Sequence, residues 1–386
     1  MGNSLSFSVT PREQLRASLV EASTGLHVDP RGRGDAIMII FFIAVYALDL
    51  VAVAYMLYNR NYPPIRCKSP ILMAGIIVSA IFWFVGDIHI NGHVPVKDTP
   101  WDNCKAFGIW INVILGVCMV SALIAIRTLG LLRVFIMGQP FRGRGLYLSI
   151  LLYTVCLLIF GTVVQVIPAK KTFYYLDVVD VCYCTNGLMA AIFALVWITW
   201  IPVVILSWRV RAIKSSFNEA LEAAVGCIIV FSVLTTVTVM HYALPNFVLS
   251  LGQRIVTTCL DQVATHVYWW TIMGVPIFNC LFRRQQYLNE WTLKLLSDGL
   301  QSEYDVVTTS ASADATLVER SSKGFSRAPA PNARYDYPYL GGSRYDIPIT
   351  DRISNGQNGG SISWPQLADY PQAKEPQPNK RHFRRW

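Results

Sequence analysis

Apolar residues in this chain gather into seven long stretches separated by short polar segments. Each stretch has the length of about 20 residues that a helix needs to cross a bilayer. Because a backbone in lipid must satisfy its own hydrogen bonds, the pattern predicts an all-α integral membrane protein, a seven-transmembrane helix bundle. The predicted spans are Ala36–Tyr58, Ile71–Ile90, Ala106–Leu131, Leu146–Ile167, Gly187–Trp208, Ala223–Leu244 and Ile255–Phe282.

The pattern changes on both sides of the predicted bundle, which we place at 35–283. Residues 1–34 are polar and predict a short extracellular N-terminal tail. Over 284–300, Leu288, Trp291 and Leu295 form one apolar stripe, which predicts an amphipathic juxtamembrane helix lying on the inner leaflet. Ser, Pro, Gly and Asn dominate 301–386 without apolar periodicity, and this predicts a disordered cytoplasmic tail.

Composition supports a membrane protein over a soluble one. The chain is 53% hydrophobic and 15% charged, against about 25% charged residues in ordinary soluble domains. A net charge of +9 would suit nucleic-acid binding in a soluble protein. Here the cations lie between apolar stretches, a pattern typical of membrane topology, so we expect no nucleic-acid partner.

Lysine and arginine are shared unevenly between the two sets of connecting segments, and the richer set should face the cytoplasm. We therefore expect a multi-pass plasma-membrane protein with its N-terminus outside and its C-terminus inside. Arg31 and Arg33 argue the other way but are outnumbered. The richer set is Arg60, Arg66, Lys68, Arg133, Arg142, Arg144, Arg209, Arg211, Lys214, Arg283 and Arg284, and the poorer set is Lys97, Lys105, Lys170, Lys171 and Arg254.

Three cysteines fall on the expected outer, oxidising side. Cys104 opens the third span, and Cys182 and Cys184 lie in the loop between the fourth and fifth spans. A disulfide from Cys104 to either of the other two would tie this loop over the mouth of the bundle. The sequence leaves the choice between Cys182 and Cys184 open.

Polar side chains inside a membrane are costly and mark candidate functional groups. Seven of them fall in the outer halves of the spans, which favours a ligand cavity open to the outside. The alternative is a set of hydrogen bonds between helices, worth roughly 0.6 kcal/mol a pair. The candidate ligand-binding residues are Asp87, His89, Asn112, His241, Asp261, Gln262 and His266. Asp49, in the middle of the first span, has no partner evident in the sequence.

Catalytic and cofactor chemistry find little support in the sequence. The last span has no lysine, which excludes a retinal Schiff base. The membrane histidines all lie towards one side, whereas a transmembrane dihaem protein needs them at opposite depths. We therefore expect a protein that is not an enzyme and holds no cofactor or metal.

Four segments resemble the class C seven-helix G-protein-coupled receptors, and among them the fungal receptors related to the RGS-linked seven-helix proteins. "SFNEA" is similar to the Phe-Asn-Glu-Ala signature of that class, and "PPIRCKSP" and "IRTLGLLRVF" resemble its motifs at spans two and three. Gly130 replaces an arginine expected there. The segments are Ser216–Ala220, Pro63–Pro70, Ile126–Phe135 and Phe82–Pro95.

The resemblance implies a receptor that transduces an extracellular or membrane-borne signal to a heterotrimeric G protein. Residues 1–34 are too few for the outer ligand-binding domain of class C, so we expect an unknown small ligand to bind within the bundle. In that class the matching glutamate pairs with a basic residue ending span three, which here implies a switch made by Arg127 and Glu219. Alternatively, Ser216 and Glu219 form only a capping box.

The basic inner loops complete the expected receptor. We expect them to face the G protein, while lipid headgroup contact alone is the alternative. The rival functions are a seven-span transporter and a ligand-less adaptor that acts through its tail; a homodimer stays open. The expected G-protein-facing residues are Arg133, Arg142, Arg144, Arg209 and Arg211.

Overall fold

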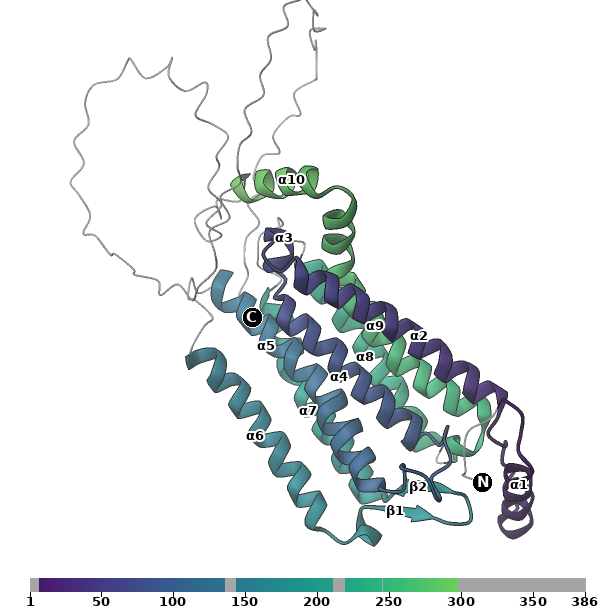
Figure 1. The fold of residues 1–386 in the computed structure, drawn as a ribbon. Helices are drawn as coiled ribbons and strands as arrows, with labels where there is room; N and C mark the ends of the chain where they lie inside the picture. Colours follow the sequence, from purple (N-terminus) through teal and green to yellow (C-terminus); the bar gives the residue numbers. More distant parts are fainter. Residues whose placement is uncertain (1–6, 136–143, 211–218, 245, 298–386) are drawn as a thin grey trace, which may run out of the picture. The chain divides into compact units, whose positions relative to one another are not determined.

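The computed structural model describes residues 7–135, 144–210, 219–244 and 246–297, and its long helices lie side by side (Figure 1). The elements are α1 (Pro11–Thr24), α2 (Arg33–Tyr58), α3 (Pro63–Arg66), α4 (Pro70–Ile90), η1 (Ala106–Cys118), α5 (Met119–Phe135), α6 (Arg144–Val166), η2 (Ala169–Lys171), β1 (Phe173–Leu176), β2 (Val181–Cys184), α7 (Asn186–Val210), α8 (Glu219–Ala243), η4 (Phe247–Leu249), α9 (Leu251–Phe282) and α10 (Arg284–Ser297).

Six segments in the described part of the chain are helices long and apolar enough to cross a membrane. The protein is therefore helical and membrane-embedded in character. These segments are Arg33–Tyr58, Pro70–Ile90, Ala106–Arg133, Arg144–Val166, Asn186–Arg209 and Ala224–Ala243. The seventh predicted segment lies within α9, a helix of 32 residues. Arg254, Asp261 and Gln262 make α9 more polar than the other six.

The third predicted span is not one uniform helix. It begins as the π-helix η1 and continues as α5, with a break at Gly116, where φ is −85° and ψ is −110°. A methyl group at position 116 would lie 2.8 Å from Trp83 Cα, so α4 and η1 approach each other too closely for a larger side chain. Small residues allow this kind of close helix packing in membranes.

Helix α4 packs against α2, η1, α5 and α9. Helices α5, α7, α8 and α9 then follow one another by contact, while α6 packs on η1 and α5. Met73, Ile76, Ile109, Trp269 and Met273 are almost fully buried between these helices. Residues of α4 and η1, in the N-terminal half of the chain, therefore share one core with residues of α9, in the C-terminal half.

One end of the bundle, which we call the hairpin end, carries α1, residues 91–105 and the antiparallel pair β1–β2. A disulfide joins Cys104 to Cys182, with 5.5 Å between their Cα atoms, and so decides the choice that the sequence left open. Cys184 is a free thiol. Helix α1, which the apolar pattern does not reveal, starts at the N-cap Thr10, whose hydroxyl accepts a hydrogen bond from the Glu13 amide.

The opposite end, which we call the basic end, carries α3, α10 and the last turns of α5 and α7 (Figure 1). Helix α10 forms within the predicted segment 284–300; its Trp291 is 5% exposed, and Leu288 packs partly buried against the core. Tyr62 Oη donates to the Arg284 carbonyl at 2.8 Å. The tail predicted over 301–386 lies outside the described residues.

Candidate ligand cavity

A cavity of about 130 Å³ lies between the long helices and extends to the hairpin. Side chains of α4, η1, α5, α7, α8 and α9 line it, together with Phe173 of β1 and Cys184 of β2. Trp200 and Tyr268 line it as well, on α7 and α9. Ligand sites of helical bundles are built in this way, from side chains on facing helices.

Asp87 is a polar group of the cavity lining whose two carboxylate oxygens both accept hydrogen bonds. Its Oδ1 accepts from Asn112 Nδ2 at 2.8 Å, and its Oδ2 accepts from Gln262 Nε2 at 2.7 Å. Tyr46 Oη donates to Gln262 Oε1 and so orients that amide. A methyl group at Gly86 would lie 2.5 Å from Asn112 Cα, which explains how η1 comes close enough to α4 for these contacts.

Asp261 of α9 is the second carboxyl group in the cavity lining, and it differs from Asp87 in its partners. The residue is 7% exposed. Within the described part of the chain, no hydrogen bond or ion pair reaches its carboxylate. Thr265 Oγ1 donates to the Asp261 backbone carbonyl at 3.2 Å, and this bond does not involve the carboxylate. Its carboxylate is therefore a buried acceptor that faces the cavity with no protein donor.

The rest of the lining is largely apolar and aromatic. Among the described residues no lysine or arginine lines the cavity. His241 lines it too, and its Nδ1 donates to the Val237 carbonyl at 2.9 Å, which leaves Nε2 as an acceptor in the neutral ring. The aromatic lining residues are Trp83, Phe173, Phe193, Trp200 and Tyr268.

Four of the seven residues predicted to bind a ligand line this cavity: Asp87, Asn112, His241 and Asp261. The other three lie outside the lining. Gln262 is fully buried behind Asp87, where it supports the carboxylate. His89 and His266 face other parts of the bundle.

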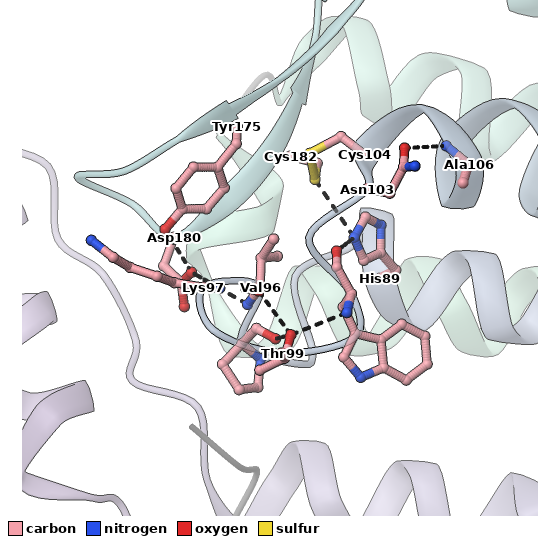
Figure 2. The surroundings of a disulfide bond; sticks show 12 residues. His89, Val96, Lys97, Thr99, Asn103, Cys104, Ala106, Tyr175, Asp180 and Cys182 are labelled. Carbon is pink, nitrogen blue, oxygen red and sulfur yellow. Dashed lines mark hydrogen bonds between the residues drawn. A yellow bond between two sulfur atoms is a disulfide. The ribbon is translucent and has the colours of Figure 1, made fainter. Parts of the chain in front are cut away.

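His89 belongs to the packing around the disulfide (Figure 2). Its Nε2 lies 2.7 Å from the Trp101 carbonyl and 3.6 Å from Cys182 Sγ. Its ring stacks on Phe107 at 4.7 Å between centroids. These contacts fix the loop that carries Cys104 and leave His89 fully buried, away from the cavity.

His266 points from α9 towards α2 and gives Asp49 a partner that the sequence did not suggest. His266 Nε2 lies 3.5 Å from Asp49 Oδ2, and Trp270 Nε1 donates to Asp49 Oδ1 at 2.9 Å. The imidazole also packs edge-on against Tyr46, with 4.7 Å between ring centroids. The role of this histidine is thus to join two helices.

A buried ion network holds the hairpin end together. Arg31 Nη1 lies 2.7 Å from Asp180 Oδ2 and 3.3 Å from Glu13 Oε1, and Arg31 Nε donates to the Gly92 carbonyl at 2.8 Å. The Lys97 amide and Tyr175 Oη both donate to Asp180 Oδ1 (Figure 2). Burial acts to raise the pKa of Asp180, but the Arg31 guanidinium outweighs it and holds the pKa below its usual value.

A second buried network lies beside the first. Arg254 donates two hydrogen bonds to Asp35, from Nε to Oδ1 at 2.8 Å and from Nη2 to Oδ2 at 2.7 Å. His93 Nδ1 lies 2.7 Å from Asp35 Oδ1, and Thr258 Oγ1 lies 3.0 Å from His93 Nε2 and accepts from Asn91 Nδ2 at 2.8 Å. Burial lowers the pKa of His93 despite the bond to Asp35, so the ring is neutral at pH 7.

At the basic end, an ion pair joins the start of α4 to α8. Lys68 Nζ lies 2.6 Å from Glu222 Oε2, and both side chains are largely buried. Arg127 is 3% exposed, and its Nε donates to the Lys68 carbonyl at 3.4 Å. Glu219 begins α8, but its side chain lies outside the described residues, so the Arg127–Glu219 switch stays a prediction.

Of the five arginines predicted to face the G protein, three belong to the described part of the chain and two do not. Arg133 lies in the last turn of α5, Arg144 begins α6, and Arg209 lies in the last turn of α7. Arg142 and Arg211 lie outside the described residues. A methyl group at Gly145, next to Arg144, would lie 2.5 Å from Arg133 Nη1, so the last turn of α5 and the first turn of α6 are close together.

A second, water-sized cavity of about 10 Å³ separates Arg127 from the larger one. Ile124, Trp200 and Tyr268 line both cavities and form the partition between them. A methyl group at Gly226 would lie 2.6 Å from Tyr268 Cδ2, so the tyrosine ring rests directly on the backbone of α8. A ligand that displaced Tyr268 would push on α8 at this point.

The sequence analysis did not single out several of the residues that form the networks and the partition. Asp35 and Arg254 have opposite charges at the starts of α2 and α9, on the same side of the expected membrane, and this could have suggested the pair. Tyr268 follows Asp261 by seven residues, which places both on one face of a helix. Asp180 gives no such signal, because it lies in the turn between β1 and β2 and not at the start of a helix that the apolar pattern marks.

Comparison with models of protein families and with curated protein sequences gives no match. The case for a function therefore rests on the geometry of the cavity, the networks and the basic end.

Proposed function

We propose that the protein is a plasma-membrane receptor in which α9 is the seventh span, and that it couples a ligand in the large cavity to a heterotrimeric G protein at the basic end. The proposed orientation puts the hairpin end outside, where a disulfide forms readily. It agrees with the rule that cytoplasmic connections carry the excess of lysine and arginine.

The buried charge pairs strengthen this orientation. Arg31 and Arg254 count against it when charges are tallied along the sequence. In the folded protein both guanidiniums are paired with buried acids, Arg31 with Asp180 and Arg254 with Asp35. Neither is a free cation at the membrane surface, whereas Arg209 at the basic end is exposed.

The observation that carries the proposal is the partition shared by the two cavities. Tyr268 contacts the ligand cavity on one side, the cavity next to Arg127 on the other, and the α8 backbone at Gly226. A receptor needs an element with two arrangements whose balance a ligand shifts. Repacking of Tyr268 against α8, with the Lys68–Glu222 pair resisting it, supplies such an element.

Nucleotide exchange on a purified Gα, with the receptor in lipid nanodiscs, tests this proposal. Gly226→Ala should force Tyr268 off α8 and raise ligand-free exchange by about fivefold or more, within the usual range of allosteric coupling. Gly252→Ala is the matched control, because a methyl group there meets nothing within 4 Å. Glu222→Gln should also raise exchange, by weakening the pair with Lys68.

Two results would contradict the receptor assignment. One is the absence of Gα exchange in native and variant proteins that are folded and inserted. The other is substrate flux into vesicles that Asp87→Asn abolishes, which would point to a transporter. If Glu219→Gln and Arg127→Ala raise exchange equally and not additively, the predicted switch is supported; if Glu219→Gln leaves exchange unchanged, the glutamate serves as a cap.

A further inference from the structure

Asp261 stands apart from the other ionisable groups on α9. Arg254 faces Asp35 of α2, and His266 faces Asp49 of the same helix. Asp261 is 7% exposed and has no donor for its carboxylate in the described part of the chain. A buried acceptor without a donor is destabilising, because it gives up its hydrogen bonds to water and gains none in return. A protein that keeps such a group at a cavity wall gains from it when a ligand supplies the donor.

The charge around the cavity indicates the sign of that ligand. Asp87 and Asp261 both line it, and Asp87 is held by the neutral amides of Asn112 and Gln262. No lysine or arginine lines the cavity within the described residues. His241 also lines the cavity, and its Nδ1 already donates a hydrogen bond to the Val237 carbonyl. An anionic ligand would find two acidic groups and no cation, whereas a cationic ligand would find a carboxyl group that is open to serve as its counterion.

The walls indicate the rest of the ligand. Aromatic rings attract cations through their faces, and five aromatic residues line the cavity. A cavity of about 150 Å³ holds benzene in a protein interior, so the observed volume of about 130 Å³ suits an apolar body of that size. A hydrated metal ion would leave most of this apolar surface without contact.

We propose that the cavity binds a small protonated amine carried on an apolar body about the size of a benzene ring, with the Asp261 carboxylate as its counterion. This inference rests on the proposed receptor function, of which the cavity is the ligand site. The ammonium group donates to Asp261 and lies near Asp87, while the apolar body packs between Phe193, Trp200 and Tyr268. The body thereby reaches the partition through which the receptor is proposed to signal.

Three probes of nearly equal size and different charge test the assignment. They are 2-phenylethylamine, 2-phenylethanol and 3-phenylpropanoate, each titrated against the full-length protein in nanodiscs at pH 7.4, with binding followed by intrinsic tryptophan fluorescence and thermal stabilisation. The amine should bind at least about tenfold more tightly than the alcohol, which corresponds to about 1.4 kcal/mol. The carboxylate should not bind.

Three variants locate the effect. Asp261→Asn should weaken amine binding at least about tenfold and leave alcohol binding unchanged, which also shows that the variant is folded. Asp177→Asn is the matched control, because its side chain is 71% exposed beside Lys97. Val237→Phe fills the cavity without changing charge and should weaken both probes.

Equal affinity for amine and alcohol, amine binding that Asp261→Asn leaves unchanged, or no amine binding at all would overturn the assignment. So would stabilisation by sodium over potassium that needs Asp261 while the amine has no effect, because the occupant would then be an inorganic cation. Binding needs no G protein, so the two proposals fail separately. Amine binding that depends on Asp261, without Gα exchange, would contradict the receptor function and support the amine site. Gα exchange without amine binding would support the receptor function and contradict the amine site.

Discussion

Two buried acidic clusters pack against α9, and they differ in how many hydrogen-bond donors reach their carboxylates. At Asp35, Arg254 supplies two hydrogen bonds and His93 a third, so the carboxylate has donors on both oxygens. At the cavity, Asp87 receives two amide bonds and Asp261 receives none in the described part of the chain. A carboxylate whose oxygens all accept hydrogen bonds from other helices stabilises the packing of those helices. A carboxylate without donors in a cavity lowers stability but offers a binding site.

The largest expected effect comes from breaking the saturated cluster. Asp35→Asn leaves the Arg254 guanidinium buried without a counter-charge, and the free energy of unfolding should fall by about 3–5 kcal/mol. Denaturant titration of the purified protein in detergent micelles measures the change. Asp177→Asn removes the acid of an exposed pair with Lys97 and should leave the unfolding curve unchanged. Equal losses in the two variants would refute the distinction between buried and exposed pairs.

Removing the disulfide should have the next largest effect. Cys182→Ser opens the link to Cys104 and should lower the free energy of unfolding by about 2–4 kcal/mol. The hairpin that borders the cavity should loosen, with faster amide hydrogen exchange over β1 and β2. Cys184→Ser is the control, because this thiol is free. A loss with Cys184→Ser and none with Cys182→Ser would show that the other pairing forms.

The open cluster should respond in the opposite direction. Asp261→Leu removes a buried carboxyl group that lacks a donor and replaces it with an apolar side chain of similar shape, so the free energy of unfolding should rise by about 1 kcal/mol in the absence of ligand. The same denaturant titration measures it. A fall of similar size would mean that the carboxylate has a stabilising partner, and the contrast between the two clusters would be lost.

The smallest effect should come from pH acting on the saturated cluster. The folded pKa of His93 lies below the unfolded value of 6.5, so its contribution to stability is complete above pH 6.5 and is lost as the pH falls towards the folded value. The thermal unfolding midpoint should therefore fall between pH 7.5 and pH 5.5. In His93→Gln the fall should be smaller; an identical fall would assign the pH dependence to other groups.

The sequence predicted well those features that depend on local pattern. Long apolar stretches predicted the long helices. The apolar stripe through Leu288 and Trp291 predicted α10, because residues three and four positions apart lie on the same face of a helix. The approximate depth of Asp87, Asn112, His241 and Asp261 followed from counting along the spans, and all four line one cavity.

Features that depend on which helix faces which were missed or left open. Helical spacing does not tell whether His266 faces the cavity or α2, and it faces Asp49. The pairing of Cys104 depends on how the hairpin lies over η1. The π-helical winding of η1 and the close approach of Gly116 to Trp83 were not predicted, because no property of the segment itself reveals them.

The polarity of α9 has a consequence for how the chain is made. As the proposed seventh span, a helix that carries Arg254, Asp261 and His266 gains little by entering lipid alone, since a charged aspartate near the helix centre costs about 2.5–3.5 kcal/mol during insertion. Its partners Asp35, Asp49 and Asp87 lie on α2 and α4, which the ribosome completes first. Integration of α9 is thus expected to wait for those helices, so that a defect in an early span shows up as failed biogenesis of the last one.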